Sequence, residues 1–382
     1  MEQHKVPHVV ILPLPLSGHV KPMLILAELL CDAGFLITFV NSDYNHDRLE
    51  RVMDIPAFYN RSPGFRFVSI SDGLPLDQPR LGPIIFQLFF NTRTVSKPLF
   101  RELLISLRQS TERSPPTCII ADGLMCFAID VAEELGVPII TFPTHGYHGM
   151  WTIMHTSNLI EEGEVPFQAS DCLTTEESDM DKPITSIPGM ESLLRRRDLP
   201  GNCRLEVENP LMEFIISEAS AMKRASTLIL NTFEELEAPI IAHLGSFFDK
   251  VYTIGPLHAL LKTRIKDSSQ AVSSYGSLRK EDSSCVEWLN SQPLKSVIYV
   301  SFGSVVELSL DQLIELWHGL VNSRKPFLWV IVRDLMEDKR EEIIRSTNEI
   351  ARMARGSVKE NGSSHCNLER LIEDLRLMSL TN

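Results

Sequence analysis

Residues 8–34 read HVVILPLPLSGHVKPMLILAELLCDAG, and this stretch decides the fold. The apolar run at 8–14 predicts a strand, and the pattern from Lys21 to Gly34 predicts a helix that ends at the glycine. His19 stands at the junction, directly after a Ser-Gly turn. Two readings are open: His19 caps or packs the helix start, or it is a catalytic base that points into a cleft.

Short apolar runs continue to alternate with helical patterns over the first 150 residues. Further strands are predicted at 36–42, 65–70, 117–123 and 138–144. Runs rich in Ile and Val that alternate with helices indicate a parallel sheet covered on both faces. The first part of the chain is therefore predicted to be a doubly wound α/β domain.

The second half of the chain predicts a linker and a shorter α/β unit. After strand-like runs at 225–237 and 251–257, residues 258–285 are polar and rich in Ser and Lys, which is typical of a linker. We therefore expect domains at 1–257 and 286–382. The second shows strand patterns at 296–304 and 326–332 and a helical pattern at 310–323, and then one long charged helical pattern and a last amphipathic stretch with no further strand. Two strands are fewer than a sheet normally has, so we interpret this domain as incomplete.

Composition excludes several classes of protein. The chain has 382 residues, of which 43% are hydrophobic, and its net charge of −13 argues against a nucleic acid or an anionic membrane as partner. Seven cysteines without a C-x-x-C pair argue against a disulfide framework and a zinc site. We find no secretory signal and no stretch long enough to span a bilayer, so we expect a cytoplasmic protein. We also expect it to be a monomer.

Several familiar catalytic motifs are absent. The sequence contains no G-x-G pair, no G-x-x-x-x-G-K-[ST] loop and no H-E-x-x-H. The segment SFGSVV is not a G-x-S-x-G nucleophile elbow. Dehydrogenase, P-loop and Ser-His-Asp hydrolase chemistry are therefore poorly supported.

His19 has one candidate partner. Asp122 ends the run CIIAD, and the carboxyl ends of parallel strands meet at one edge of a sheet, where ligands bind. A carboxylate on one imidazole nitrogen fixes the tautomer and stabilises the imidazolium. The positive end of the helix disfavours that imidazolium by about 0.3–1 kcal/mol. We expect a histidine that is neutral at rest and charged in the transition state; a packed His19 and an Asp122 that caps the next helix remain the alternative.

Segments spread along nearly the whole chain resemble the plant UDP-dependent glycosyltransferases, which glucosylate small secondary metabolites. Within the family the sequence is similar to the iridoid glucosyltransferases that act on 7-deoxyloganetic acid. The matching segments are HVVILPLPLSGHVKPMLILAELL, IIADGLMCFAIDVAEELGVP, IPGMESLLRRRDLP, ILNTFEELE, YTIGPL, CVEWLNSQPLKSVIYVSFGS and GSSHCNLERLIEDLRL.

The resemblance implies a GT-B architecture, in which two Rossmann-like domains enclose the active site. It implies inverting transfer of glucose from UDP-glucose, a co-substrate, to a hydroxyl or carboxyl of a small acceptor, with no other cofactor and no metal. His19 would be the general base and Asp122 its support, while Gly18 and His19 would contact the acceptor. Gly303 and Ser304 would contact the diphosphate of the donor. The final helix would cross back onto the first domain.

The donor-binding signature of the family is missing. It begins Trp-Ala-Pro-Gln and contains His-x-Gly-Trp-Asn-Ser, and neither occurs here. Segments that flank it in the family abut at Ile331–Val332, which indicates an internal loss on the order of a hundred residues. We therefore expect an impaired enzyme. One alternative is a non-catalytic protein that binds the acceptor or regulates a relative. The other is a chain that does not fold stably, because the segments SVIYVSF and FLWVIV leave apolar surface uncovered.

Overall fold

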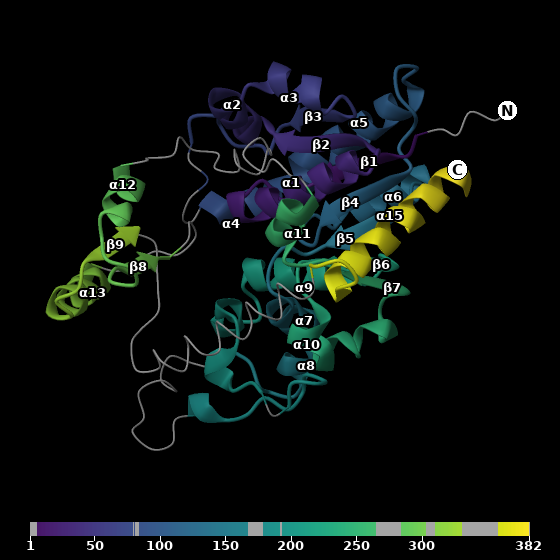
Figure 1. The fold of residues 1–382 in the computed structure, drawn as a ribbon. Coiled ribbons are helices and arrows are strands. Elements are labelled where there is room, and N and C mark those ends of the chain that lie inside the picture. The colour runs from purple at the N-terminus through teal and green to yellow at the C-terminus, as the bar shows by residue number, and fades with distance from the viewer. Residues whose placement is uncertain are drawn as a thin grey trace.

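The structure is a computed structural model, and it describes residues 6–78, 80, 84–166, 179–191, 193–264, 284–302, 310–330 and 358–381. A seven-stranded, all-parallel sheet forms its main body (Figure 1). Its strands are β1 (His8–Leu12), β2 (Leu36–Ser42), β3 (Phe65–Ile70), β4 (Cys118–Asp122), β5 (Ile139–Phe142), β6 (Thr227–Leu230) and β7 (Lys250–Thr253). The predicted doubly wound α/β domain is confirmed.

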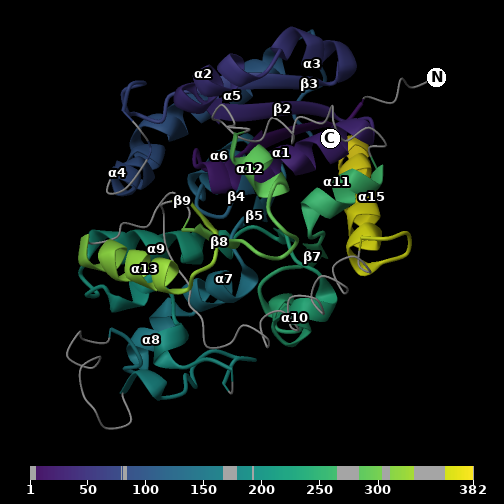
Figure 2. The ribbon, with the colours of Figure 1, turned by 60° about the vertical axis from the view of Figure 1, so that its left-hand side comes forward.

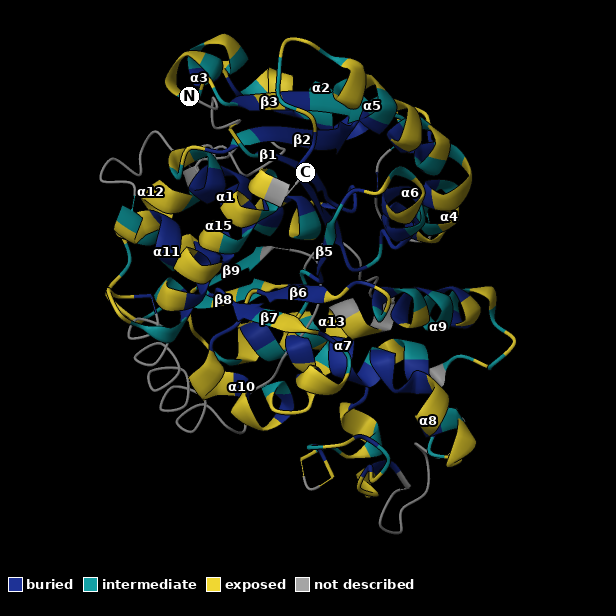
Figure 3. Cartoon of the chain, turned by 90° about the vertical axis from the view of Figure 1, so that its right-hand side faces the viewer, coloured by how far each residue is buried: buried dark blue, intermediate teal, exposed yellow. Residues whose placement is uncertain are grey.

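Helices cover both faces of this sheet (Figure 3). They are α1 (Ser17–Asp32), α2 (Asp43–Val52), α3 (Ile55–Arg61), α4 (Ile84–Asn91), α5 (Lys97–Gln109), α6 (Phe127–Leu135), α7 (Tyr147–Met154), α8 (Thr156–Glu161), α9 (Pro210–Met222), α10 (Glu234–Ile241) and α11 (Leu257–Arg264), with a π-helical turn η1 (Thr92–Ser96) between α4 and α5. Side chains alternate between the faces along each strand. Val9 and Ile11 pack with α1 and α11, whereas Val10 and Leu12 pack with α5 and α6.

Proline shortens two of the predicted strands. The run expected as a strand over 8–14 ends at Leu12, and the run over 138–144 ends at Phe142. Pro13 and Pro143 follow these last strand residues, and a proline has no N–H to donate to a sheet ladder. Both strands therefore end two residues before the end of the apolar run that predicts them.

The strand order is β3-β2-β1-β4-β5-β6-β7, so the direction of winding reverses between β1 and β4. The connection after β1 leads toward β2, on one side, while β4 pairs with β1 on the other side. In sheets of this kind the carboxyl ends of the two central strands border a crevice, and ligands bind there. The residues that follow Leu12 and Asp122 lie at this switch point.

The last described helix, α15 (Ser363–Thr381), packs on the first domain beside β7 (Figure 1). Leu368, Leu371 and Leu375 are completely buried in the same core as α1 and α11. Lys250 pairs with Asp374 at 2.5 Å, and Asn367 donates to the hydroxyl of Thr253 at 2.8 Å. The two ends of the chain thus share one hydrophobic core.

Helix α11 overlaps the start of the range 258–285 that the sequence predicts as a linker. Leu257, Leu260 and Leu261 are buried against the first domain, so residues 258–264 belong to that domain. The linker prediction was wrong for residues 258–264. It followed the Ser- and Lys-rich composition of the later residues and did not give weight to the short apolar pattern of Leu257, Leu260 and Leu261. Residues 265–283 lie outside the described part of the chain.

The second domain is a small unit of helix α12 (Ser284–Asn290), strand β8 (Ile298–Ser301), helix α13 (Leu310–Asn322) and strand β9 (Phe327–Val330). Strands β8 and β9 are parallel and form a two-stranded sheet, apart from the main sheet (Figure 1). Every residue of β1 is buried, but Leu294, Tyr299 and Trp317 are 92%, 65% and 50% exposed. Within the described residues, the second domain thus has two strands and leaves large apolar side chains exposed. The junction at Ile331–Val332 lies outside the described residues.

Within the described ranges, no helix is both long enough and apolar enough to cross a membrane.

Candidate active site

His19 occupies the third position of α1, just beyond the carboxyl end of β1. The residue at the N-cap position of this helix is Leu16, and it makes no side-chain capping hydrogen bond. His19 donates its backbone N–H to the carbonyl of Leu16 at 2.9 Å, and its side chain is left for other contacts. The interpretation of His19 as a helix cap is therefore wrong.

Asp122 is the last residue of β4 and is 1% exposed. Its Oδ2 lies 2.8 Å from Nδ1 of His19, and its Oδ1 accepts the backbone N–H of Leu124 at 3.0 Å. The two side chains meet because β1 and β4 are neighbours at the switch point of the sheet. The structure thus brings together the two residues that the sequence proposes as a pair.

Thr144 is a third member of this contact. Its hydroxyl lies 2.7 Å from Nδ1 of His19 and donates to Oδ2 of Asp122 at 3.2 Å. Sequence reasoning missed this residue, although a signal was present. Thr144 closes the run PIITFPT, which supplies β5, the strand beside β4. Its position therefore falls at the same edge of the sheet as His19 and Asp122.

Charge and burial act in opposite directions on the pair. Burial disfavours the imidazolium of His19, but the charge of Asp122 and its hydrogen bond outweigh burial and raise the pKa of His19 above its ordinary value. For Asp122, burial likewise works against the charged form, yet His19 and the Leu124 N–H bring its pKa below the usual range. This upward shift acts against the neutral imidazole expected at rest, and the neutral state that a general base requires stays a prediction.

His145 has the opposite electrostatic behaviour. Burial lowers the pKa of His145 to about 4, although the charge of Asp122 acts to raise it and His19 acts to lower it further. This imidazole is therefore neutral at physiological pH. Of these two histidines, His19 is the one that the structure places within hydrogen-bond distance of the Asp122 carboxylate.

The loop that carries Asp122 is held by close packing. A Cβ on Gly123 would lie 2.9 Å from Cβ of Pro143 and 3.2 Å from Cε of Met222. These contacts are closer than side chains normally make, so only glycine fits between β4, the end of β5 and α9. Gly123 thereby fixes the distance between the strand ends that hold Asp122 and Thr144.

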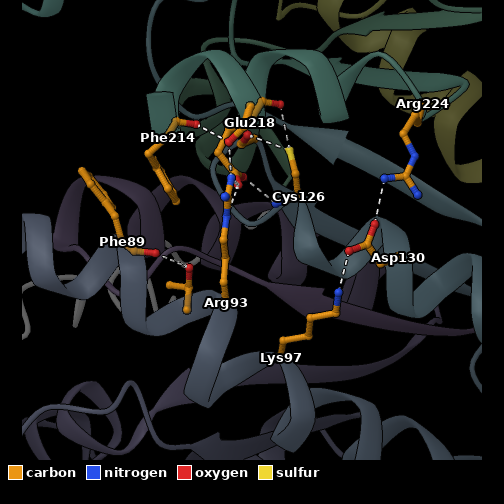
Figure 4. Close-up of polar contacts among 11 residues, drawn as sticks. Phe89, Arg93, Lys97, Cys126, Asp130, Phe214, Glu218 and Arg224 are labelled. Atoms are coloured by element: carbon orange, nitrogen blue, oxygen red, sulfur yellow. Dashed lines mark hydrogen bonds and ion pairs between the residues drawn. The ribbon is translucent and has the colours of Figure 1, made fainter. Parts of the chain in front are cut away.

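A buried carboxylate fixes the next few residues (Figure 4). Glu218 of α9 accepts the backbone N–H of Cys126 at 2.9 Å, which satisfies a donor at the start of α6. Arg93 of η1 donates to the other oxygen of Glu218 at 2.6 and 3.1 Å. Glu218 of α9 therefore binds the turn η1 through an ion pair and the start of α6 through a hydrogen bond, four residues beyond Asp122.

An open groove of about 590 Å³ lies next to the pair, between α1 and α11. Gly18, one of the predicted acceptor-binding residues, lines it together with Ser17 and Thr144. A Cβ on Gly18 would meet no atom within 4 Å, so this position is open. Gly303 and Ser304, the predicted donor-binding residues, lie outside the described residues.

Comparison with known proteins places these features in context. A 7-deoxyloganetic acid glucosyltransferase from Catharanthus roseus is 43% identical over 342 residues, which cover 88% of this chain and 69% of that protein. UDP-glycosyltransferase 85A7 from Arabidopsis thaliana is 40% identical over 345 residues, with coverage of 88% and 69%. The crystal structure of Os79 from O. sativa in complex with UDP superposes with a TM-score of 0.73 at 20% identity, over 96% of this chain and 100% of that chain. No protein-family model matches the chain.

Proposed function

This chain belongs to the plant UDP-glycosyltransferases, with their GT-B architecture, and we propose that its reaction is transfer of glucose from UDP-glucose to a small plant metabolite. The acceptor group is a hydroxyl or a carboxyl, and an iridoid such as 7-deoxyloganetic acid is the first acceptor to test, because that glucosyltransferase is 43% identical. The contact of 2.8 Å between His19 and Asp122 carries the proposal.

His19 would act as the general base. Asp122 and Thr144 occupy Nδ1, which leaves Nε2 as the nitrogen that can take a proton. Nε2 takes the proton of an acceptor hydroxyl while the oxygen attacks the anomeric carbon of the sugar. The bond from that carbon to the diphosphate breaks, UDP leaves with the electron pair, and the configuration inverts. Asp122 stabilises the imidazolium that forms, and such base catalysis contributes roughly 10²–10⁴ in rate.

The contribution of His19 to the transfer rate depends on whether the acceptor group is a hydroxyl or a carboxyl. A hydroxyl must lose its proton as it attacks, whereas a carboxyl group with an ordinary pKa of about 4 is already ionised at neutral pH. Substitution of His19 therefore lowers transfer to hydroxyl groups much more than transfer to carboxylates. This difference separates base catalysis from a structural role of the side chain.

We propose further that this particular chain transfers glucose poorly. It lacks the family's donor-binding signature, so the uridine and the sugar have few groups to position them. Positioning of reactants accounts for ~7–11 kcal/mol of a typical barrier reduction, and His19 and Asp122 cannot replace it. The alternative role is that of a non-catalytic acceptor-binding or regulatory protein. The complete seven-stranded sheet of the first domain favours retention of acceptor binding.

One comparison tests both proposals. The purified chain and the Catharanthus roseus enzyme are incubated with UDP-glucose and 7-deoxyloganetic acid, and the glucoside is measured by mass spectrometry. We expect less than about 1% of the relative's rate, given the loss of positioning, and residual product that disappears in a His19→Gln variant. Product at the relative's rate would contradict impairment, and calorimetry without heat of acceptor binding would contradict the alternative role.

A further inference from the structure

A buried histidine holds the amino end of β1. His8 is the first residue of this strand and is 0% exposed. Its Nδ1 lies 2.7 Å from the backbone carbonyl oxygen of Ser114, and its Nε2 lies 2.8 Å from the hydroxyl of Thr38. Thr38 belongs to β2, and Ser114 lies in the segment that leads to β4. Since β1 is an interior strand between β2 and β4 (Figure 2), one imidazole connects three neighbouring parts of the sheet.

These contacts require a neutral ring in one tautomer. A carbonyl oxygen can only accept a hydrogen bond, so Nδ1 of His8 must donate its N–H to Ser114. Nε2 then carries no hydrogen and accepts the proton of the Thr38 hydroxyl. A second proton on Nε2 would remove this acceptor and would place a positive charge in a completely buried position. The hydrogen bonds of His8 therefore stabilise the neutral imidazole.

The described part of the chain gives His8 no carboxylate partner. The histidines that pair with a carboxylate there are His19, His46 and His148. A buried imidazolium without a negative charge beside it is unfavourable, because desolvation is not offset by an ion pair. Protonation of His8 is therefore compatible with water around the ring but not with its position in the sheet.

The charged group that acts on His8 is also a cation. Arg113 donates to the carbonyls of Gly64 and Ile37 at 3.1 and 3.3 Å, and its positive charge disfavours the imidazolium. The groups that act in turn on Arg113 are Arg66, Cys31, Tyr59 and Glu112. Burial lowers the pKa of His8 to about 4, the Ser114 carbonyl acts to raise it, and Arg113 lowers it further. Burial and charge thus favour the same neutral state as the hydrogen bonds.

We propose that His8 makes the first domain sensitive to acid, because a second proton on its imidazole releases the start of β1 from Thr38 and Ser114. Strand β1 leads to His19 at its other end, so the same protonation weakens the support of the candidate active site. The inference goes beyond the proposed function, since it requires neither a sugar donor nor an acceptor.

The direction of the pH dependence follows from the lowered pKa of His8. The unfolded chain takes up the proton near the ordinary value of 6.5, whereas the folded chain does so only at about pH 4. The contribution of His8 to stability is therefore complete above pH 6.5 and is lost as the pH falls toward 4. Within this window, this one proton raises the unfolding equilibrium constant by about 10-fold per pH unit.

Urea denaturation of the full chain at a series of pH values tests the proposal, with His8→Gln as the variant. The amide of glutamine can donate and accept as the neutral imidazole does, but it does not titrate. The measured quantity is the ratio of the unfolding constant of the unsubstituted chain to that of the variant. We expect this ratio to rise about 30-fold as the pH falls from about 7.5 to about 5. Groups that titrate in both chains, such as His145, cancel in the ratio.

His318→Gln is the matched control, because His318 is exposed and lies on α13 of the second domain. The corresponding ratio for this variant should stay constant with pH. A constant ratio for His8→Gln would overturn the inference. An equally large change for His318→Gln would do so as well, because the effect would then not depend on the buried position.

NMR titration of the His8 imidazole in the unsubstituted chain gives a second test that does not depend on how well the variant folds. We expect this ring to stay neutral in the folded chain down to about pH 5. A titration of the folded chain near the ordinary value of 6.5 would contradict the inference. Neither test measures glucose transfer, so failure of this inference and failure of the proposed function can be told apart.

Discussion

Nδ1 of His19 lies 2.8 Å from Oδ2 of Asp122, although 103 residues separate the two side chains in the sequence. Their mutual effects are opposite in sign: the pKa of His19 is raised from 6.5 and that of Asp122 is lowered from 3.8. The pair stabilises the fold when both groups are charged. Its contribution is lost as pH falls through the lowered pKa of Asp122, and as pH rises through the raised pKa of His19.

Asp122→Asn should therefore shift the titration of His19 to lower pH. The difference in unfolding free energy between the unsubstituted chain and this variant should be largest between the two ordinary pKa values, 3.8 and 6.5, and should shrink above the raised pKa. NMR titration of the imidazole and chemical denaturation across pH measure both effects. An unchanged His19 titration would show that Asp122 does not interact with the imidazole.

Gly123→Ala should destabilise the switch-point loop by about 1–3 kcal/mol, because the added methyl overlaps Pro143. Gly146→Ala is the control, since a Cβ there meets nothing within 4 Å and its φ is −57°. Urea denaturation measures the two free energies of unfolding. Equal values for the two variants would contradict the close packing of the loop.

Arg93→Ala should reduce the free energy of unfolding by about 2 kcal/mol, because it removes the cation from the buried carboxylate of Glu218. The cost is below that of a fully buried pair because the Arg93 side chain is 40% exposed. Arg101→Ala removes an exposed ion pair with Glu134 and should destabilise the protein much less than Arg93→Ala does. Denaturation of both variants compares the costs, and the prediction fails if the exposed pair contributes as much.

Leu371→Ala should destabilise the first domain by about 2–5 kcal/mol, because this side chain of α15 is completely buried in the shared core. Leu377→Ala makes the same substitution on the same helix at a position that is 50% exposed, and it should cost less than about 1 kcal/mol. Thermal and urea unfolding measure both. Similar small effects would mean that α15 does not contribute to the domain's stability.

The second domain should make the chain associate with itself at high concentration, contrary to the monomer expected from the sequence. Tyr299 and Ile314 are 65% and 44% exposed, and among the described residues no further strand covers either edge of the two-stranded sheet in this unit. Tyr299→Thr/Ile314→Glu should reduce the association, whereas Leu236→Glu on the first domain should not. Sedimentation velocity over a range of concentrations decides it, and a strictly monomeric unsubstituted chain would rule it out.

The sequence predicts the sheet well because buried parallel strands require continuous Ile- and Val-rich runs. It also predicts His19 and Asp122, since both follow such runs. It does not single out Thr144, because threonine is common at strand ends and only the pairing of β4 with β5 places it there.

Helix α15 has a consequence for the order in which this protein can fold. The ribosome completes the seven strands of the main sheet long before it makes Leu368, Leu371 and Leu375, which fill the last part of their core. The nascent first domain therefore presents an open apolar surface beside β7 until α15 has emerged from the ribosome. Premature termination upstream of Ser363 would leave this surface exposed, whereas loss of an internal segment preserves the helix that closes it.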